Sequence, residues 1–279
     1  TSLPQIVGGY SERCCQKAVS FWQTITSNVV TVDSLEAAEL VKLVNNSYRD
    51  LSFAFSNSFA LLCDQFNLEA KKIIGAANDG YPRDKIPFPS PGVGGYCLTK
   101  DPYLYASVGS SDGHAALSIN GRMINMKAAQ YPAEIISRYA LRTGKELRNM
   151  QVFIAGVAFK GLPETNDLRG SCGLSLAKHL QESAQELYVY DAIVSESTIE
   201  GLGLKFQSIK DGCQKCDALI IMNNHPNNFP EGTFSLFENR DVLIFDGWSL
   251  LDKYEVEQYV NLTYATMGYM TPIVSKDSW

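Results

Sequence analysis

Hydrophobic residues recur at helical spacing through most of the first half of the chain. The longest such stretch runs from Leu35 to Asn67 without a proline or a glycine, and Asp33 or Ser34 is suited to cap its start. Shorter helices are expected over 12–26, 69–77, 101–108 and 115–143, with Gly144 suited to end the last. The pattern therefore predicts a helical region that contains one long helix.

The first thirty residues have a different character. An apolar segment ends at Gly8 and Gly9 and is typical of a strand, and the β-branched run 29–32 is typical of a second. The helix between them is expected to turn Val19, Phe21 and Trp22 inward.

From Leu147 onward short apolar runs alternate with helical segments. The runs are hydrophobic throughout, which is typical of parallel strands buried on both faces. Strands are expected over 151–156, 187–191, 204–206, 218–222 and 242–245, with an amphipathic helix over 173–185. The fold class is therefore α/β, with an all-helical domain followed by a Rossmann-like parallel sheet.

Composition narrows the class of protein. Hydrophobic residues make up 45% and charged residues 19% of the 279 residues, as in a packed globular chain. The net charge of −6 argues against a nucleic-acid partner. Seven scattered cysteines do not form a disulfide framework, and the apolar runs are too short for a membrane span, so we expect a cytoplasmic protein.

The loop over 79–102 is dense in glycine and proline and carries the strongest chemical signal. Gly92, Gly94 and Gly95 allow backbone amides to approach a ligand closely. Cys97 follows them and lies near the start of a predicted helix, where the helix dipole and Lys100 favour the thiolate. A thiolate can attack an aldehyde to give a thiohemiacetal, although a buried structural cysteine is an equally simple interpretation.

Lys42 and Asn46 lie four residues apart and share one face of the long helix, to which Asn57 is expected to return. Lysine and asparagine together can stabilise an oxyanion or hold a water, but a solvated helix face would have the same pattern. Similarly, Arg169 and Ser171 precede a predicted helix where a phosphate can bind, or where the loop is simply capped.

Two further features of the sequence argue against a metal site and against an ordinary dinucleotide site. Cys213 and Cys216 have the spacing of zinc ligands, but no second pair or histidine cluster accompanies them, so no metal site is expected. No G-x-G-x-x-G motif occurs in the chain, so the sheet region is not an ordinary dinucleotide site.

Several of these segments resemble, in the same order, motifs of the UDP-glucose/GDP-mannose dehydrogenase family. The most specific is 91–101, which is similar to the family's G-x-G-G-x-C-x-x-K-D catalytic loop. The others are 3–9, similar to the end of the NAD domain, 36–46, similar to the central helix, 156–171, similar to the start of the UDP-binding domain, and the strand ends 190–191 and 245–247. The resemblance implies three parts: 1–33, a remnant of the N-terminal NAD domain; 34–145, the helical dimerisation and catalytic-loop domain; and 146–279, the UDP-sugar-binding domain.

The resemblance also implies a reaction. A UDP-hexose, either UDP-glucose or a UDP-N-acetylhexosamine, is oxidised to the UDP-uronic acid in two NAD-dependent steps, as a precursor of polysaccharide. Cys97 would carry the thiohemiacetal and the thioester, Lys42 and Asn46 would stabilise the oxyanion or the water, and Asp101 would orient or activate that water.

The binding residues follow by the same resemblance. Lys160 and Gly92, Gly94 and Gly95 would contact the UDP-sugar, Arg169 would reach the NAD pyrophosphate, and Arg83 would reach the substrate of the second subunit of a homodimer. Replacing Gly94 or Gly95 is expected to block the sugar without unfolding the chain.

Departures from the family pattern leave alternatives open. Ser58 and Trp248 stand where the family often has glutamate and arginine, and the family's N-terminal domain is missing. The chain is therefore expected to be a fragment that is inactive alone, or a non-catalytic nucleotide-sugar-binding and dimerisation module. A 6-phosphogluconate-type dehydrogenase is a weaker alternative, because it would not need Cys97.

Overall fold

The computed structural model describes residues 3–108, 113–237 and 240–272, and its first part is dominated by two long helices. They are α2, Leu35–Gln65, which Ser34 caps by accepting from the Ala37 amide, and α5, His114–Thr143, which ends at Gly144. The shorter helices are α1, Glu12–Gln23, α3, Ala70–Asn78, and α4, Asp101–Val108. The predicted helical region and its long helix are confirmed.

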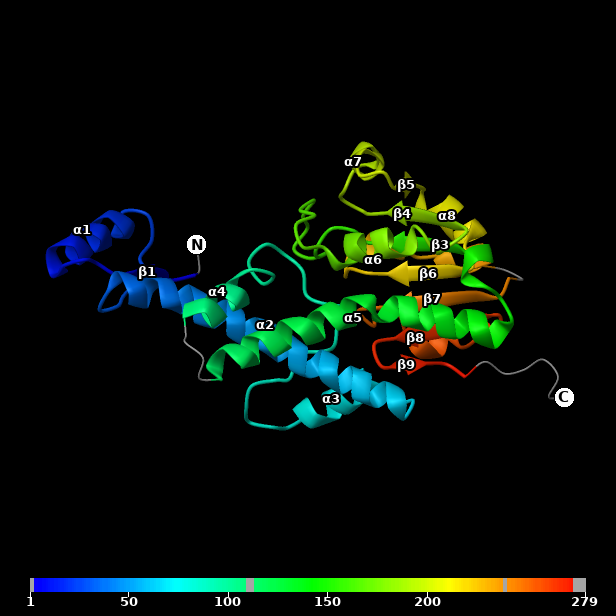
Figure 1. Cartoon of the computed structure of the whole chain (residues 1–279), viewed down its shortest axis with the longest axis horizontal. Helices are drawn as coiled ribbons and strands as arrows, with labels where there is room; N and C mark the ends of the chain where they lie inside the picture. The colour runs from blue at the N-terminus through cyan, green and yellow to red at the C-terminus, as the bar shows by residue number, and fades with distance from the viewer. Residues whose placement is uncertain (1–2, 109–112, 238–239, 273–279) are drawn as a thin grey trace.

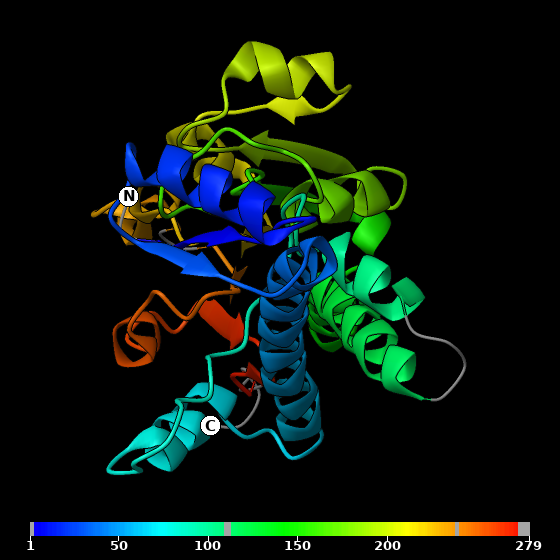
Figure 2. The ribbon, with the colours of Figure 1, turned by 90° about the vertical axis from the view of Figure 1, so that its left-hand side faces the viewer.

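The strands β1, Gln5–Val7, and β2, Val29–Thr31, pair in parallel and lie with α1 at one end of the molecule, away from the large sheet (Figure 1). One expectation here is wrong in part. Helix α1 contacts β1 and β2, and Val19 and Trp22 are half-buried, but Phe21 is 60% exposed and no residue of the helix is fully buried. In Figure 2, turned by 90°, the same unit lies in front of the sheet region.

The second part is a seven-stranded sheet in the order β5-β4-β3-β6-β7-β8-β9, parallel except for the last pair. The predicted strands are β3, Gln151–Ala155, β4, Glu186–Tyr190, β5, Lys205–Phe206, β6, Ala218–Ile221, and β7, Val242–Asp246. The sequence analysis missed β8, Leu262–Thr266, and β9, Tyr269–Met270. Polar threonines interrupt the apolar pattern of β8, and β9 is too short to have a period.

Helices cover both faces of the sheet, as the continuous apolar strands predicted. Helix α6, Cys172–Leu180, and the second half of α5 pack on one face. On the other lie α8, Ile209–Lys215, and the 3₁₀ segment η3, Thr233–Phe237. The remaining short elements are α7, Glu196–Gly201, α9, Lys253–Val256, η1, Leu147–Asn149, and η2, Pro226–Asn228. Because α5 packs against both α2 and the sheet, it joins the two parts of the chain.

Several apolar side chains remain uncovered on α2. Leu40, Val44, Phe55 and Leu62 are between 40% and 62% exposed, whereas Phe59 packs against the core. Among the described residues, no helix is both long and apolar enough to cross a membrane.

Candidate active site

Three of the predicted catalytic side chains meet where α2 and α4 cross. Asp101, the first residue of α4, is fully buried, and its Oδ2 accepts a hydrogen bond from Asn46 Nδ2 at 2.6 Å. Lys42 Nζ lies 4.0 Å from the same oxygen, and Lys100 Nζ lies 2.8 Å from Oδ1. Residues 55 positions apart in the chain therefore form one cluster, with the exposed ammonium of Lys42 at its edge.

The charge of Asp101 is set by opposing effects. Burial disfavours the carboxylate, but the hydrogen bonds from Lys100 and Asn46 and the charges of Lys100 and Lys42 outweigh it, so the pKa of Asp101 lies below its usual value. Asp101 is therefore an ionised acceptor at neutral pH and a weak base.

Replacing Asp101 by asparagine is expected to lower the stability of the chain in a pH-dependent way. A carboxylate whose pKa is lower in the folded state stabilises fully above its unfolded pKa of about 3.9, and loses this stabilisation as the pH falls through the folded pKa. We expect Asp101→Asn to cost roughly 1–3 kcal/mol at pH 7, the value of hydrogen bonds to a charged group. Thermal unfolding at a series of pH values checks this. The difference in stability between the variant and wild type should become smaller below about pH 4, and a difference that does not change with pH would contradict the prediction.

Cys97 is exposed and lies in a turn just before α4. Its carbonyl oxygen accepts hydrogen bonds from the amides of Lys100, at 3.1 Å, and Asp101, at 2.8 Å, which fixes the backbone beneath the thiol. The alternative of a buried structural cysteine is therefore wrong.

Two cations lie around the residue next to Cys97. The ring centroid of Tyr96 is 5.3 Å from Lys100 Nζ and 4.9 Å from the centre of the Arg169 guanidinium. Hydrogen bonds to Asp101 and Asp167 are the main reason that the pKa values of Lys100 and Arg169 are raised, and the charge of Cys97 contributes to both. Both cations thus lie within electrostatic range of the sulfur.

The glycines of the loop are needed for packing. Gly92 and Gly95 have φ values of 81° and 92°, in the region that favours glycine. A Cβ at Gly94 would lie 2.6 Å from the carbonyl oxygen of Gly170, in the loop before α6. Replacing Gly94 would therefore disturb the packing as well as the approach of a ligand, because the loop contacts the sheet region through its backbone.

Gly94→Ala should therefore destabilise the chain, by about 1–3 kcal/mol as for other overpacked positions. Gly75 provides the matched control, because a Cβ there meets no atom within 4 Å and the residue lies in α3. Chemical denaturation should show a loss of stability for Gly94→Ala and a small gain for Gly75→Ala. Equal effects of the two substitutions would argue against the close contact with Gly170.

A buried polar network that the sequence analysis missed supports this loop from below. Asn57 accepts from the Ser90 amide and donates to Asn125, and Asn125 donates to Asp50. Arg122 pairs with Asp50 at 2.6 Å and also donates to the Val93 carbonyl, while burial raises the pKa of Asp50 against the charge of Arg122.

This network shows what Asn57 contacts. It is fully buried, and its hydrogen bonds go to Ser90 and Asn125 and not to the Asp101 cluster. The signal that could have revealed the network is the pair Arg122 and Asn125, three residues apart on one helix, where polar side chains face the core.

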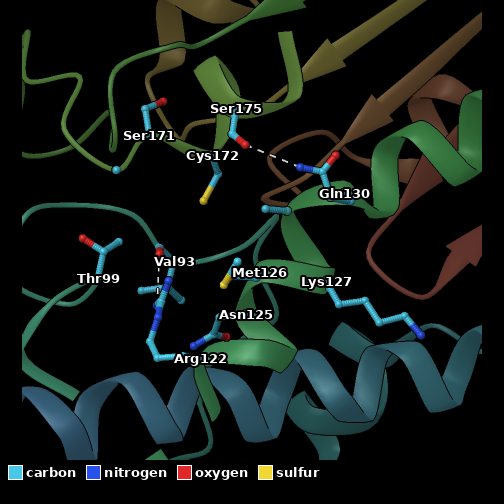
Figure 3. A pocket seen from close by; sticks show the side chains of 12 residues that line it. Val93, Thr99, Arg122, Asn125, Met126, Lys127, Gln130, Ser171, Cys172 and Ser175 are labelled. Carbon is cyan, nitrogen blue, oxygen red and sulfur yellow. Dashed lines mark hydrogen bonds between the residues drawn. The ribbon is translucent and has the colours of Figure 1, made fainter. Parts of the chain in front are cut away.

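A cavity of about 440 Å³ lies beside this network, between the catalytic loop, α5 and the start of α6 (Figure 3). Val93 and Thr99 line it from the loop, Arg122 from α5, and Cys172 from α6. Burial raises the pKa of the Cys172 thiol to about 12, which makes it a poor nucleophile at neutral pH. The cavity contains none of the predicted catalytic residues.

The loop between β3 and α6 places the predicted nucleotide contacts. Arg169 is exposed and forms a two-pronged ion pair with Asp167, whose pKa is lowered to about 2 mainly by hydrogen bonds from Arg169. Lys160 lies near the Phe159 ring, and Ser171 caps α6 as predicted, accepting from the Leu174 amide. Arg169 is thus brought to the catalytic loop through Tyr96.

The carboxyl ends of the central strands are tied together by buried polar side chains. Asp191 accepts from the amides of Val157 and Ala158, and from Asn223. Trp248, the departure noted in the sequence, is half-buried after β7 and donates its indole N–H to the carbonyl of Met222 at 3.0 Å. Ligands of parallel sheets bind at this edge.

Two candidates lie apart from the cluster. Arg83 is exposed on the long loop, with its guanidinium 4.4 Å from the ring centroid of Tyr81, and no described contact joins it to the cluster. Cys213 and Cys216 are buried, and Arg240 donates to both of their carbonyl oxygens. In residues 3–108, 113–237 and 240–272 no group of His, Cys, Asp or Glu side chains suits a metal ion.

Comparison with known families identifies the arrangement. The profile of the UDP-glucose/GDP-mannose dehydrogenase family, central domain, matches residues 36–127, and that of its UDP binding domain matches residues 153–253. The chain belongs to the UDP-glucose/GDP-mannose dehydrogenase family. The first match contains the Lys42, Asn46, Cys97 and Asp101 region, and the second contains the Lys160 to Arg169 loop.

Individual members of the family are similar over most of the chain. A UDP-N-acetyl-D-mannosamine dehydrogenase of Pyrococcus horikoshii is 29% identical over 88% of this chain, and one of Campylobacter jejuni is 29% identical over 79%. The solved structure of the UDP-D-ManNAc dehydrogenase of Pyrococcus horikoshii has a TM-score of 0.82 at 28% identity and covers 94% of this chain. The chain spans only 56% and 53% of the two relatives and 59% of the solved chain.

Proposed function

We propose that the chain is the central and UDP-binding part of an NAD-dependent nucleotide-sugar 6-dehydrogenase. The observation that carries this proposal is the cluster in which Lys42 and Asn46 converge on ionised Asp101, next to a turn that exposes Cys97. These are the groups that a four-electron oxidation through a covalent thioester requires.

The reaction proceeds in four steps at the C6 carbon of the sugar. NAD, when bound, would supply the electron acceptor for both oxidations. The alcohol would lose a hydride from C6 and its hydroxyl proton to solvent, and the Cys97 thiolate would add to the resulting aldehyde. The thiohemiacetal loses a second hydride and becomes a thioester, which water hydrolyses to the uronic acid. Lys42 and Asn46 stabilise the oxygen of C6 wherever negative charge develops on it. Because its pKa is low, Asp101 orients the water and holds Lys42 and Asn46, and does not store a proton.

The chain supplies only part of the cofactor site. The Arg169 side chain is 65% exposed, and its guanidinium offers free donors to a pyrophosphate, so it fits the role that the resemblance gave it. The glycine fingerprint does not occur in this sequence, and we assign the main NAD site to a dinucleotide-binding domain outside it.

For the substrate we propose a UDP-N-acetylhexosamine, with Lys160 and the backbone of Gly92, Gly94 and Gly95 on the UDP-sugar. The similarity to UDP-N-acetyl-D-mannosamine dehydrogenases favours this sugar class over UDP-glucose. We further propose a homodimer through the exposed apolar face of α2, since large exposed apolar patches mark interfaces, and Arg83 would reach the second subunit's substrate.

The 279-residue chain is expected to bind UDP but to form no NADH with any nucleotide sugar. Titration calorimetry with UDP should show binding that weakens about tenfold or more in Lys160→Ala, as for the loss of a charge-assisted hydrogen bond. Absorbance at the NADH band should stay flat. NADH formation by the chain alone would contradict the assignment of the NAD site. UDP binding without any activity of the full-length protein would favour the non-catalytic module.

A further inference from the structure

The thiol of Cys97 lies on a loop beside an aromatic ring and two cations. All seven cysteines lie in the described part of the chain, and only Cys14 and Cys97 are exposed. Cys97 stands beside Tyr96, whose ring contacts both Lys100 and Arg169, whereas Cys14 lies in the first turn of α1. Nearby cations stabilise a thiolate, which is the reactive form of cysteine.

The groups that act on a carbonyl oxygen lie one helical turn further along. The Asp101 amide donates to the Cys97 carbonyl at 2.8 Å, and the Asp101 side chain receives Asn46 at 2.6 Å and faces Lys42 at 4.0 Å. The side chains of Lys42 and Asn46 can donate hydrogen bonds, but they cannot accept electrons. The chemistry that they offer is therefore stabilisation of an oxyanion.

Acyl transfer through a thiol needs a nucleophile, donors for the tetrahedral oxyanion and a positioned water, but it needs no electron acceptor. The exposed Cys97 supplies the nucleophile and is open to water, and Lys42 and Asn46, which meet at Asp101, supply the donors. Hydride transfer needs a cofactor whose main site we place outside the chain. The two halves of the proposed reaction therefore separate physically.

We propose that this chain, without NAD, hydrolyses activated esters through Cys97. The thiolate sulfur attacks the ester carbonyl carbon, and the C–O bond to the alcohol breaks as the alkoxide or phenolate leaves with the bonding electrons. Water then adds to the thioester carbon, the C–S bond breaks, and the acid is released with its protons lost to solvent while Cys97 returns as thiolate. The sum is ester plus water to acid plus alcohol, with no oxidation.

This proposal rests on the role of Cys97 in the proposed function. The substrates are small esters with a good leaving group. A poor leaving group would have to be protonated, and no histidine stands among the described residues next to Cys97 in the sequence to do so. The two cations beside Tyr96 favour neutral or anionic acyl groups over cationic ones.

p-Nitrophenyl acetate tests the proposal at neutral pH with the chain as it stands. We expect a burst of p-nitrophenolate of about one equivalent per chain, followed by steady turnover, with acetyl groups found on the Cys97 peptide by mass spectrometry. Cys97→Ser should lower the steady rate at least tenfold, and Lys42→Ala should slow both phases. Asp101→Asn should keep the burst and slow the steady phase. Cys14→Ser, which removes the other exposed thiol, should leave both phases unchanged.

Release that stops after the first equivalent would overturn the proposal, as would a steady rate that survives Cys97→Ser. Unchanged circular dichroism of each variant shows that a loss of rate is not a loss of fold. The assay contains neither NAD nor nucleotide sugar, so its failure is separate from a failure of the full-length protein to form NADH. An active esterase in a full-length protein that oxidises no nucleotide sugar would retain this proposal and remove the proposed function.

Discussion

In the full-length enzyme of which we propose that the chain is part, Cys97→Ser should stop the second oxidation and leave product at the aldehyde level. The first hydride leaves an alcohol carbon and does not need the nucleophile. The second leaves a covalent adduct that a serine hydroxyl, almost fully protonated at neutral pH, forms poorly. We expect uronic acid formation to fall by roughly a thousandfold or more, as for other removed nucleophiles.

Product analysis by mass spectrometry under single-turnover conditions measures this effect. Cys14→Ser is the matched control, because Cys14 is also exposed but lies on α1, away from the cluster. Uronic acid formed by Cys97→Ser at a near wild-type rate would show that the loop only binds the substrate.

Lys42→Ala should slow both hydride transfers in the same full-length enzyme. Each transfer changes the charge on the C6 oxygen. Lys42 is the ammonium at the edge of the Asp101 cluster, with its side chain 63% exposed and its Nζ 4.0 Å from the carboxylate. Loss of one such stabilising group costs about 3–4 kcal/mol, or roughly 10²–10³-fold in kcat.

Single-turnover traces should resolve the two NADH-forming phases of this variant. Lys178→Ala, an exposed lysine on α6, should behave as wild type. If only the second phase slows in Lys42→Ala, the lysine acts on the thioester chemistry alone.

The sequence predicted those elements whose signal is local. The long helix follows from 31 residues without a breaker, and the central strands from apolar runs that both faces of the sheet bury. Helix α1 could be located by its period, but its exposure could not be predicted, because burial depends on what packs against it. Strands β8 and β9 were not predicted, because their own residue pattern does not indicate a strand. They become strands by pairing, β8 with β7 and β9 with β8.

The candidate site could be predicted in part for the same reason. Lys42 and Asn46 share a helix face by spacing alone, but only the fold brings Asp101 between them. The burial of Asn57 shows the limit of helical spacing. A side chain can lie on the predicted face of a helix and still be buried. Helix α5 covers the later turns of α2, and Asn125 accepts a hydrogen bond from the side-chain amide of Asn57.

The role of Tyr96 was also beyond the sequence. Its ring contacts the guanidinium of Arg169, which lies 73 residues later in the sequence, so the contact joins two separate loops. Loop-to-loop contacts have no period and no fixed spacing, so residue patterns do not reveal them.

The stoichiometry of oxidation in the full-length protein tests the central claim most directly. With a limiting amount of UDP-N-acetyl-D-mannosamine and excess NAD, we expect two molecules of NADH for each sugar consumed, and the Cys97 peptide should carry the sugar when the reaction is quenched in progress. One NADH for each sugar, or no adduct on Cys97, would contradict the claim that this chain carries the nucleophile of a nucleotide-sugar 6-dehydrogenase.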